Sequence, residues 1–249
     1  MSFDAVFAVF VLAVILTTAT VSIRAFARSG RDLSGVHGSA VLGPLLRSWY
    51  FENLRPFEDW CVRHGVQPAT LTYAQLVLSV AVAACYAAGL FFTAGWLLLA
   101  TSSFDIIDGR LARRTGTGSA QGAFLDSVVD RYADSFTYIG LAIYLHDSWL
   151  LWVTLLCLLG GSMVSYTRAR AEALGVECNV GLLQRPERTV ILGLGSMFSV
   201  LVDRLTGPWW GVDNGLLAVT LVALAVLSNV SALHRAGHVH RALKGPGNA

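Results

Sequence analysis

The sequence predicts an all-α integral membrane protein, and two properties of its composition indicate this fold class. Of its 249 residues, 55% are hydrophobic and only 14% are charged, a charged share roughly half that of an ordinary soluble domain. A transmembrane helix needs about 20 predominantly apolar residues, so this chain has room for several such helices and little else. The formal net charge of only +2 argues against a nucleic acid as a partner.

Seven apolar runs predict seven membrane spans. They cover residues 3–23, 72–93, 95–112, 119–145, 149–166, 189–203 and 215–233. Arginines gather in the segments after the first, third, fifth and seventh runs, and the positive-inside rule therefore places these segments in the cytoplasm. The first run has no positive charge before it, so we expect an uncleaved helix with its N-terminus outside. The protein is thus expected in the cytoplasmic (inner) membrane.

Residues 44–63 are predicted to form an amphipathic helix that lies in the cytoplasmic interface. Trp49, Leu54 and Phe57 recur there at helical spacing, with charged residues between them, which is typical of a helix that rests on a membrane surface. We expect residues 1–36 to form an N-terminal transmembrane helix with its linker. Residues 37–249 are expected to form one domain that contains the interfacial helix and six transmembrane helices.

Four aspartates lie near the cytoplasmic ends of two consecutive predicted spans. Asp105 and Asp108 belong to one span, and Asp126 and Asp130 belong to the next. At about 100° per residue, the two members of each pair share one helix face. The spans are joined by a short turn, so we expect antiparallel neighbouring helices whose four carboxylates converge in one pocket. Ionised side chains in a bilayer are costly, which marks these aspartates as functional candidates.

The carboxylates predict a divalent metal site. Ligands that are all oxygen suit a hard cation such as Mg²⁺ or Mn²⁺, and two such ions can stabilise both the attacking and the leaving oxygen of a phosphate-bearing substrate. A protein of another class, an ion or proton-coupled membrane transporter, also uses aspartates within the membrane, and it stays open as the alternative.

The spacing of these residues resembles a family signature. At every fixed position, the pattern Asp105-x2-Asp108-Gly109-x2-Ala112-Arg113-x8-Gly122-x3-Asp126-x3-Asp130 is similar to the signature of the CDP-alcohol phosphotransferase family. The resemblance implies a six-helix core, to which the first predicted span looks like an addition, and a homodimer among membrane lipids. It also implies an enzyme of phospholipid synthesis. Such an enzyme transfers a phosphatidyl group from CDP-diacylglycerol to the hydroxyl of a small polar alcohol and releases CMP.

The same resemblance implies a role for each residue of the signature. The four aspartates bind the divalent ions, and Asp130 is also the general base. The residues implied to contact the CDP moiety are Asp108, Gly109, Arg113, Gly122 and Thr72. Outside the signature, Asp134 continues the aspartate stripe, and we interpret it as a structural partner of Arg131 or of a polar group on a neighbouring helix.

Residues 165–188 bear on the choice of acceptor. They resemble the synthases of phosphatidylinositol phosphate in actinobacteria and of archaetidylinositol phosphate in archaea. The residues that match are Ser165, Tyr166, Ala169, Arg170, Ala171, Glu172, Arg185, Glu187 and Arg188. The implied acceptor is inositol 1-phosphate, with its phosphate held by Arg168, Arg185 and Arg188.

Two alternatives stay open for this stretch. Taken alone, its arginines could equally well set the orientation of the protein in the membrane or contact anionic lipids. The same chemistry with glycerol 3-phosphate, serine or another alcohol is the second alternative, because the stretch departs from the resemblance at two positions. Arg168 replaces a lysine there, and Gln184 replaces a glutamate.

Overall fold

The computed structural model describes residues 17, 20–26, 44–178, 180–181, 183–206 and 214–244. Its main helices are α2 (Pro44–Arg63), α3 (Pro68–Ala87), α4 (Phe91–Thr115), α5 (Ala120–Tyr144), α6 (Leu150–Ala173), α7 (Arg185–Thr206) and α8 (Gly215–Leu243). These residues contain no strand, and the all-α class is confirmed. Most of the predicted first span and its linker lie outside the described residues.

Three of the described helices combine the length and the apolar composition that crossing a membrane requires. These are α3, α6 and α8, with mean hydropathies of 1.5, 1.6 and 2.3. Helices α4 and α5 have 25 residues each and α7 has 22, which at about 1.5 Å per residue also exceeds a hydrocarbon core of about 30 Å. Large apolar side chains such as Val77, Trp152 and Leu233 are exposed, as expected for a surface that meets lipid.

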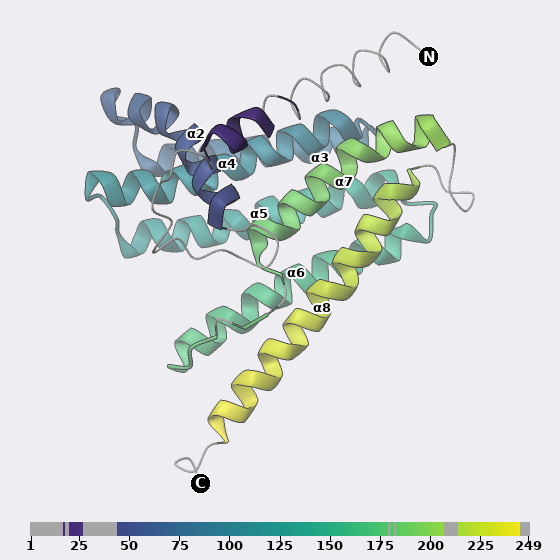
Figure 1. The fold of residues 1–249 in the computed structure, drawn as a ribbon. Helices are drawn as coiled ribbons and strands as arrows, with labels where there is room; N and C mark the ends of the chain where they lie inside the picture. Colours follow the sequence, from purple (N-terminus) through teal and green to yellow (C-terminus); the bar gives the residue numbers. More distant parts are fainter. Residues whose placement is uncertain are drawn as a thin grey trace.

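Helix α3 is central to the part of the bundle that carries the aspartates. It packs extensively against both α4 and α5, whereas α4 and α5 make little contact with each other (Figure 1). The expectation that α4 and α5 are close neighbours is therefore wrong over most of their length, although they do run in opposite directions. Close packing explains the difference, since a Cβ at Gly140 of α5 would collide with the backbone of Ala83 on α3.

A short turn between α4 and α5 reverses the chain. Helix α4 is capped by Gly116, the residue after its end, whose φ of 67° lies in the left-handed region. Glycine adopts this conformation without steric penalty. Helix α5 then begins after Ser119, whose Oγ accepts a hydrogen bond of 3.0 Å from the backbone N–H of Gly122. Such a cap satisfies one of the free N–H groups of a helix start. The turn brings the aspartate-bearing ends of both helices to the same end of the bundle.

Helix α2 has the bounds that the sequence predicts and packs against α4. One of its charged residues, Glu58, is only 3% exposed. Its carboxylate accepts hydrogen bonds from the guanidinium of Arg110, and Arg114 pairs with the neighbouring Asp59 at 2.6 Å. In the sequence, Glu58 is one of the charged residues between the apolar ones, yet its side chain lies on the same side of α2 as Leu54 and Cys61, which pack against α4.

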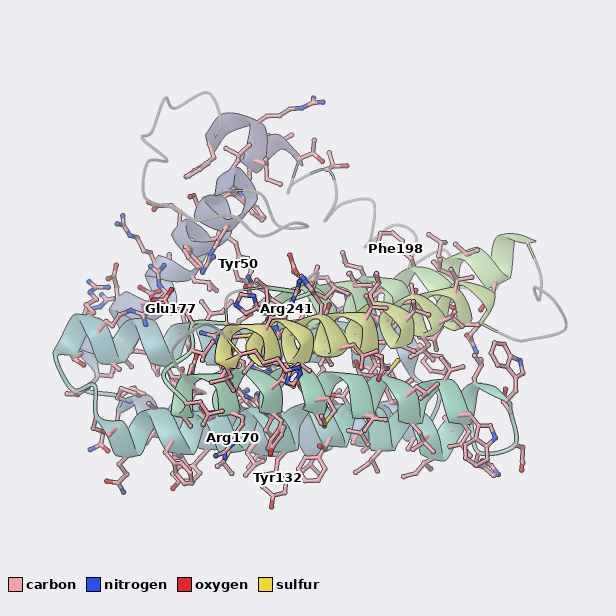
Figure 2. All side chains as sticks on the ribbon, turned by 90° about the horizontal axis from the view of Figure 1, so that it is seen from below. Tyr50, Tyr132, Arg170, Glu177, Phe198 and Arg241 are labelled. Atoms are coloured by element: carbon pink, nitrogen blue, oxygen red, sulfur yellow. The ribbon has the colours of Figure 1, made fainter. Side chains whose placement is uncertain are left out.

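A second contact fixes α2 nearer its start. The hydroxyls of Tyr50 and Ser103 on α4 lie 2.5 Å apart, and burial raises the pKa of the Tyr50 phenol above its ordinary value, so it stays protonated. In Figure 2, Tyr50 lies in the same half of the bundle as Arg170 of α6 and Arg241 of α8, whereas Phe198 of α7 lies in the other half. In this view, Arg170 and Arg241, which lie near the C-terminal ends of α6 and α8, thus share one half of the bundle with Tyr50.

Candidate active site

A compact group of carboxylates is formed by residues of α4 and α5. Asp105, Asp108 and Asp126 each offer one carboxylate oxygen, and these three oxygens lie within 4.8 Å of one another. Asp108 is buried. In the same group, Oδ1 of Asp126 is buried and has no hydrogen-bond partner among the described residues.

This donor set fits a hard divalent cation. Three converging carboxylates repel one another at low dielectric unless a positive charge lies among them. A buried carboxylate oxygen without a partner is equally unfavourable, and a cation supplies the missing interaction. Oxygen donors of this kind are those preferred by Mg²⁺ and Mn²⁺. The residues present therefore fit the metal that the sequence predicts.

Helix α3 supplies two polar side chains to the carboxylates. Thr72 donates a hydrogen bond of 2.8 Å from its hydroxyl to Oδ2 of Asp108. Gln75 donates one of 3.0 Å from Nε2 to Oδ1 of Asp130. Thr72 is a predicted contact of the CDP moiety, and the structure places it against a signature aspartate. Gln75 was missed by the sequence analysis, although a glutamine one turn after Thr72 in an apolar helix was a usable signal.

The fourth signature aspartate, Asp130, lies beside an arginine of α7. Nη1 of Arg185 is 2.8 Å from Oδ1 of Asp130 and 2.9 Å from Oδ2 of Asp105. Nε of Arg185 is 3.1 Å from Oδ1 of Asp134, whose other oxygen is 3.3 Å from Nη2 of Arg188. Asp134 thus pairs with a neighbouring helix, one of the two structural partners considered above. Arg185 and Arg188 therefore lie at the same end of the bundle as the aspartates of α4 and α5.

The three arginines predicted to bind the acceptor phosphate occupy different surroundings. Arg185 and Arg188 are both turned inward, and Arg188 lies next to Gly161 of α6, where a Cβ would be 3.7 Å from its guanidinium. Arg168 is exposed and pairs with Glu172 one turn along the same helix at 2.9 Å. The structure brings Arg185 and Arg188 to the aspartates and leaves Arg168 on the surface.

The remaining residues predicted to contact CDP line the ends of α4 and α5. Among the side chains of the described residues, chain neighbours aside, only the guanidinium of Arg113 comes within 4 Å of the Cβ position of Gly109, at 3.5 Å. Arg113 itself is exposed. Gly122 lies in the first turn of α5, where the Oγ of Ser119 is the sole close neighbour of its Cβ position among the described residues. These positions leave room for a ligand beside the carboxylates.

The model of one protein family, described as CDP-alcohol phosphatidyltransferase, matches residues 66–231. The chain belongs to this family. Membership confirms the enzyme interpretation over the transporter one, and together with the three apolar helices it makes this CDP-alcohol phosphatidyltransferase an integral membrane enzyme. The match includes all four signature aspartates as well as Thr72 and Gln75.

Named relatives lie in one branch of the family. The archaetidylinositol phosphate synthase of Methanothermobacter thermautotrophicus is 36% identical over 77% of this chain and 92% of its own length. The phosphatidylinositol phosphate synthase of Streptomyces avermitilis is 34% identical over 86% of this chain and 89% of its own length. Both names agree with the branch that residues 165–188 indicate.

Solved structures of the Mycobacterium tuberculosis phosphatidylinositol phosphate synthase are similar to this CDP-alcohol phosphatidyltransferase. The structure with CDP-DAG bound is 32% identical, has a TM-score of 0.66 and covers 78% of this chain and 94% of its own. The structure in complex with manganese and citrate is also 32% identical, has a TM-score of 0.67 and covers 78% of this chain and 90% of its own.

Proposed function

We propose that this enzyme transfers the phosphatidyl group of CDP-diacylglycerol to a hydroxyl of inositol 1-phosphate and releases CMP. The observation that carries the proposal is the position of Arg185, within 3 Å of both Asp105 and Asp130. A phosphate-binding side chain and a candidate general base thus lie side by side, as an acceptor that carries both a phosphate and a reactive hydroxyl requires. The names of the similar synthases support the same acceptor.

The aspartates are assigned the metal and the base roles. Asp105, Asp108, Asp126 and Asp130 hold two Mg²⁺ or Mn²⁺ ions, which when bound neutralise the diphosphate and make CMP a better leaving group. Asp130 takes the proton of the acceptor hydroxyl as attack on phosphorus begins. Thr72 orients Asp108 through its hydrogen bond, and Gln75 orients Asp130 in the same way.

The substrates are assigned to two sides of the carboxylate group. Gly109, Arg113 and Gly122 contact the CDP moiety, whose lipid chains enter laterally from the bilayer between α4 and α5. Arg185 and Arg188 hold the acceptor phosphate, since arginine suits bidentate phosphate binding. Arg168, which is exposed, meets the acceptor as it arrives from the cytoplasm.

The proposal includes the placement and assembly of the enzyme. The aspartates face the cytoplasm in the inner membrane, in accord with the arginines of the segments on that side. Residues 1–36 form a separate N-terminal helix with its linker, and residues 37–249 form the catalytic domain. Two such domains associate as a homodimer.

An acceptor panel tests the proposal. Purified full-length protein is given CDP-diacylglycerol, with Mg²⁺ or Mn²⁺, and in separate reactions inositol 1-phosphate, glycerol 3-phosphate, serine and inositol. CMP release and the lipid product are measured. The expected result is CMP release with inositol 1-phosphate and little with the others. Release with glycerol 3-phosphate or serine alone would assign the enzyme to that acceptor and overturn this one.

A further inference from the structure

A positive charge already lies within the acidic group. Arg185, the first residue of α7, pairs with Asp105, Asp130 and Asp134 at 2.9, 2.8 and 3.1 Å. Only 18% of its side chain is exposed. The guanidinium therefore neutralises carboxylates that come from two other helices.

Arg185 and a metal ion make competing demands on the same carboxylate. Asp105 is one of the three aspartates whose oxygens converge within 4.8 Å, and it is also a partner of Nη1 of Arg185. A guanidinium and a divalent ion a few ångströms apart repel each other strongly at low dielectric. Arg185 in this position therefore opposes the binding of an ion at Asp105.

The same contact occupies one carboxylate oxygen of the candidate base, Asp130. Oδ1 of Asp130 accepts the hydrogen bond of Gln75 and also faces Nη1 of Arg185. With two donors at one oxygen, that oxygen is engaged before any acceptor hydroxyl arrives. Asp130 gains capacity to accept a proton there only when Arg185 moves away.

Arg185 has a second anchor that permits this movement. Its Nε contacts Asp134, one helical turn beyond Asp130, and Arg188 supports Asp134 from the other side. The Nη1 group can leave Asp105 and Asp130 while Nε stays with Asp134. An acceptor phosphate near Arg185 and Arg188 offers the freed N–H groups a new anionic partner.

We propose that Arg185 is a movable counter-ion of the metal centre, which neutralises Asp105 and Asp130 until the phosphate of the acceptor draws it away. This inference rests on the proposed function. It goes further because it couples the two sites: acceptor binding raises the affinity for the metal ion and frees the base together. By linkage, metal binding raises the affinity for the acceptor by the same factor.

The test measures metal binding without any turnover. Full-length protein in lipid nanodiscs without CDP-diacylglycerol is titrated with Mn²⁺, and free Mn²⁺ is followed by electron paramagnetic resonance. For Arg185→Gln, we expect Mn²⁺ binding that is tighter than wild type by roughly tenfold or more, because a competing positive charge is gone. Arg185→Lys keeps the charge and loses the planar fork, so its Mn²⁺ affinity should lie between those of the wild type and Arg185→Gln. This variant serves as the test if Arg185→Gln does not fold.

Arg188→Gln is the matched control, because Arg188 pairs with Asp134 and has no ion pair with Asp105 or Asp130 in the described part of the chain. Its Mn²⁺ affinity should change much less than that of Arg185→Gln, because the Arg188 guanidinium contacts Asp134 and not the carboxylates of Asp105 and Asp130. A second titration contains inositol 1-phosphate, which should tighten Mn²⁺ binding to the wild type and leave Arg185→Gln unchanged. The two titrations together separate competition by Arg185 from any effect of the acceptor alone.

Two results would overturn the inference. A Mn²⁺ affinity of Arg185→Gln that is equal to or lower than that of the wild type would show that Arg185 does not compete with the ion. Tighter binding by this variant, without any response of the wild type to inositol 1-phosphate, would remove the link to the acceptor. CMP release in the acceptor panel is independent of both titrations, so the proposed function stands or falls separately.

Discussion

The carboxylate of Glu58 on α2 is buried against α4, where it accepts hydrogen bonds from the guanidinium of Arg110. Arg110 lies two residues after Asp108 and next to Gly109. Helix α2 is thereby attached to the turn of α4 that carries Asp108 and Gly109, two of the residues proposed to bind the metal ion and the nucleotide. The contact between α2 and α4 thus contributes to the position of the signature residues on α4.

Loss of this contact should reduce stability. Glu58→Gln removes a charge-assisted hydrogen bond from a buried position, and such bonds contribute about 1.5–3 kcal/mol. We expect a clear drop in the thermal unfolding midpoint of the detergent-solubilised protein. The control is Glu52→Gln, because Glu52 pairs with the exposed Arg55 on the same helix and surface pairs contribute less than about 1 kcal/mol. Equal midpoints for the two variants would contradict a structural role for the buried pair.

Asp130→Asn should abolish turnover while the protein stays folded. The amide cannot take a proton from the acceptor hydroxyl, and general base catalysis contributes roughly 10²- to 10⁴-fold to a rate. CMP release is the measurement, with thermal unfolding and size-exclusion profiles as controls for folding. Near-normal release by the purified variant would rule out Asp130 as the base.

Gln75→Leu should reduce kcat more than it changes KM for either substrate. The variant loses the hydrogen bond to Oδ1 of Asp130, and a bond to a charged group is worth about 1.5–3 kcal/mol, or roughly 10- to 100-fold in rate. Ser79→Ala is the matched control one turn further along α3, because the Ser79 hydroxyl bonds to the backbone of its own helix. An unchanged kcat for Gln75→Leu would leave Gln75 with a packing role only.

Asp126→Asn should weaken the binding of divalent ions. Oδ1 of Asp126 is a buried acceptor without a hydrogen-bond partner in the described residues, and the amide replaces one charged ligand by a neutral one. We expect a Mn²⁺ affinity lower by roughly tenfold or more, together with activity that recovers in part at high Mn²⁺. Wild-type enzyme treated with EDTA should lose activity and regain it on addition of Mg²⁺ or Mn²⁺. Unaltered metal affinity in the variant would exclude Asp126 as a ligand.

Gly116→Ala should destabilise the turn between the aspartate-bearing helices. Apart from the adjoining residues of the turn, no atom of the described part of the chain lies within 4 Å of the added Cβ. The effect therefore comes from the backbone φ of 67°, a conformation that costs an L-residue about 1–2 kcal/mol. Gly118→Ala in the same turn is the control, because its Cβ position is equally open and it has no positive φ. The measurement is the thermal unfolding midpoint of each variant relative to wild type. An equal drop in the midpoint for Gly118→Ala and Gly116→Ala would argue against backbone strain.

Local spacing was sufficient to predict several features. The bounds of α2 followed from its amphipathic pattern, and the convergence of Asp105, Asp108 and Asp126 followed from helical periodicity and a short turn. These features depend on residues that are close in the sequence, where the geometry of one helix or one turn decides the outcome.

Features that depend on packing between distant segments were not predictable in this way. The position of α3 against both α4 and α5 depends on a close contact such as that of Gly140 with Ala83. The pairing of Arg185 with Asp130 joins residues of different helices. The burial of Glu58 was missed because a charged residue between apolar ones is usually interpreted as solvent-exposed. The partners that neutralise it lie on α4, and no local pattern reveals them.

The contrast in hydropathy among the helices has a consequence for biosynthesis. Helix α3 is apolar enough to partition into the bilayer by itself, and the ribosome releases it before α4 and α5. It carries Thr72 and Gln75, whose donors bond to Asp108 and Asp130 of the later helices. We therefore expect α4 and α5 to leave the translocon as a group with α3. Thr72 and Gln75, which donate hydrogen bonds to Asp108 and Asp130, would then also help these aspartates to enter the membrane.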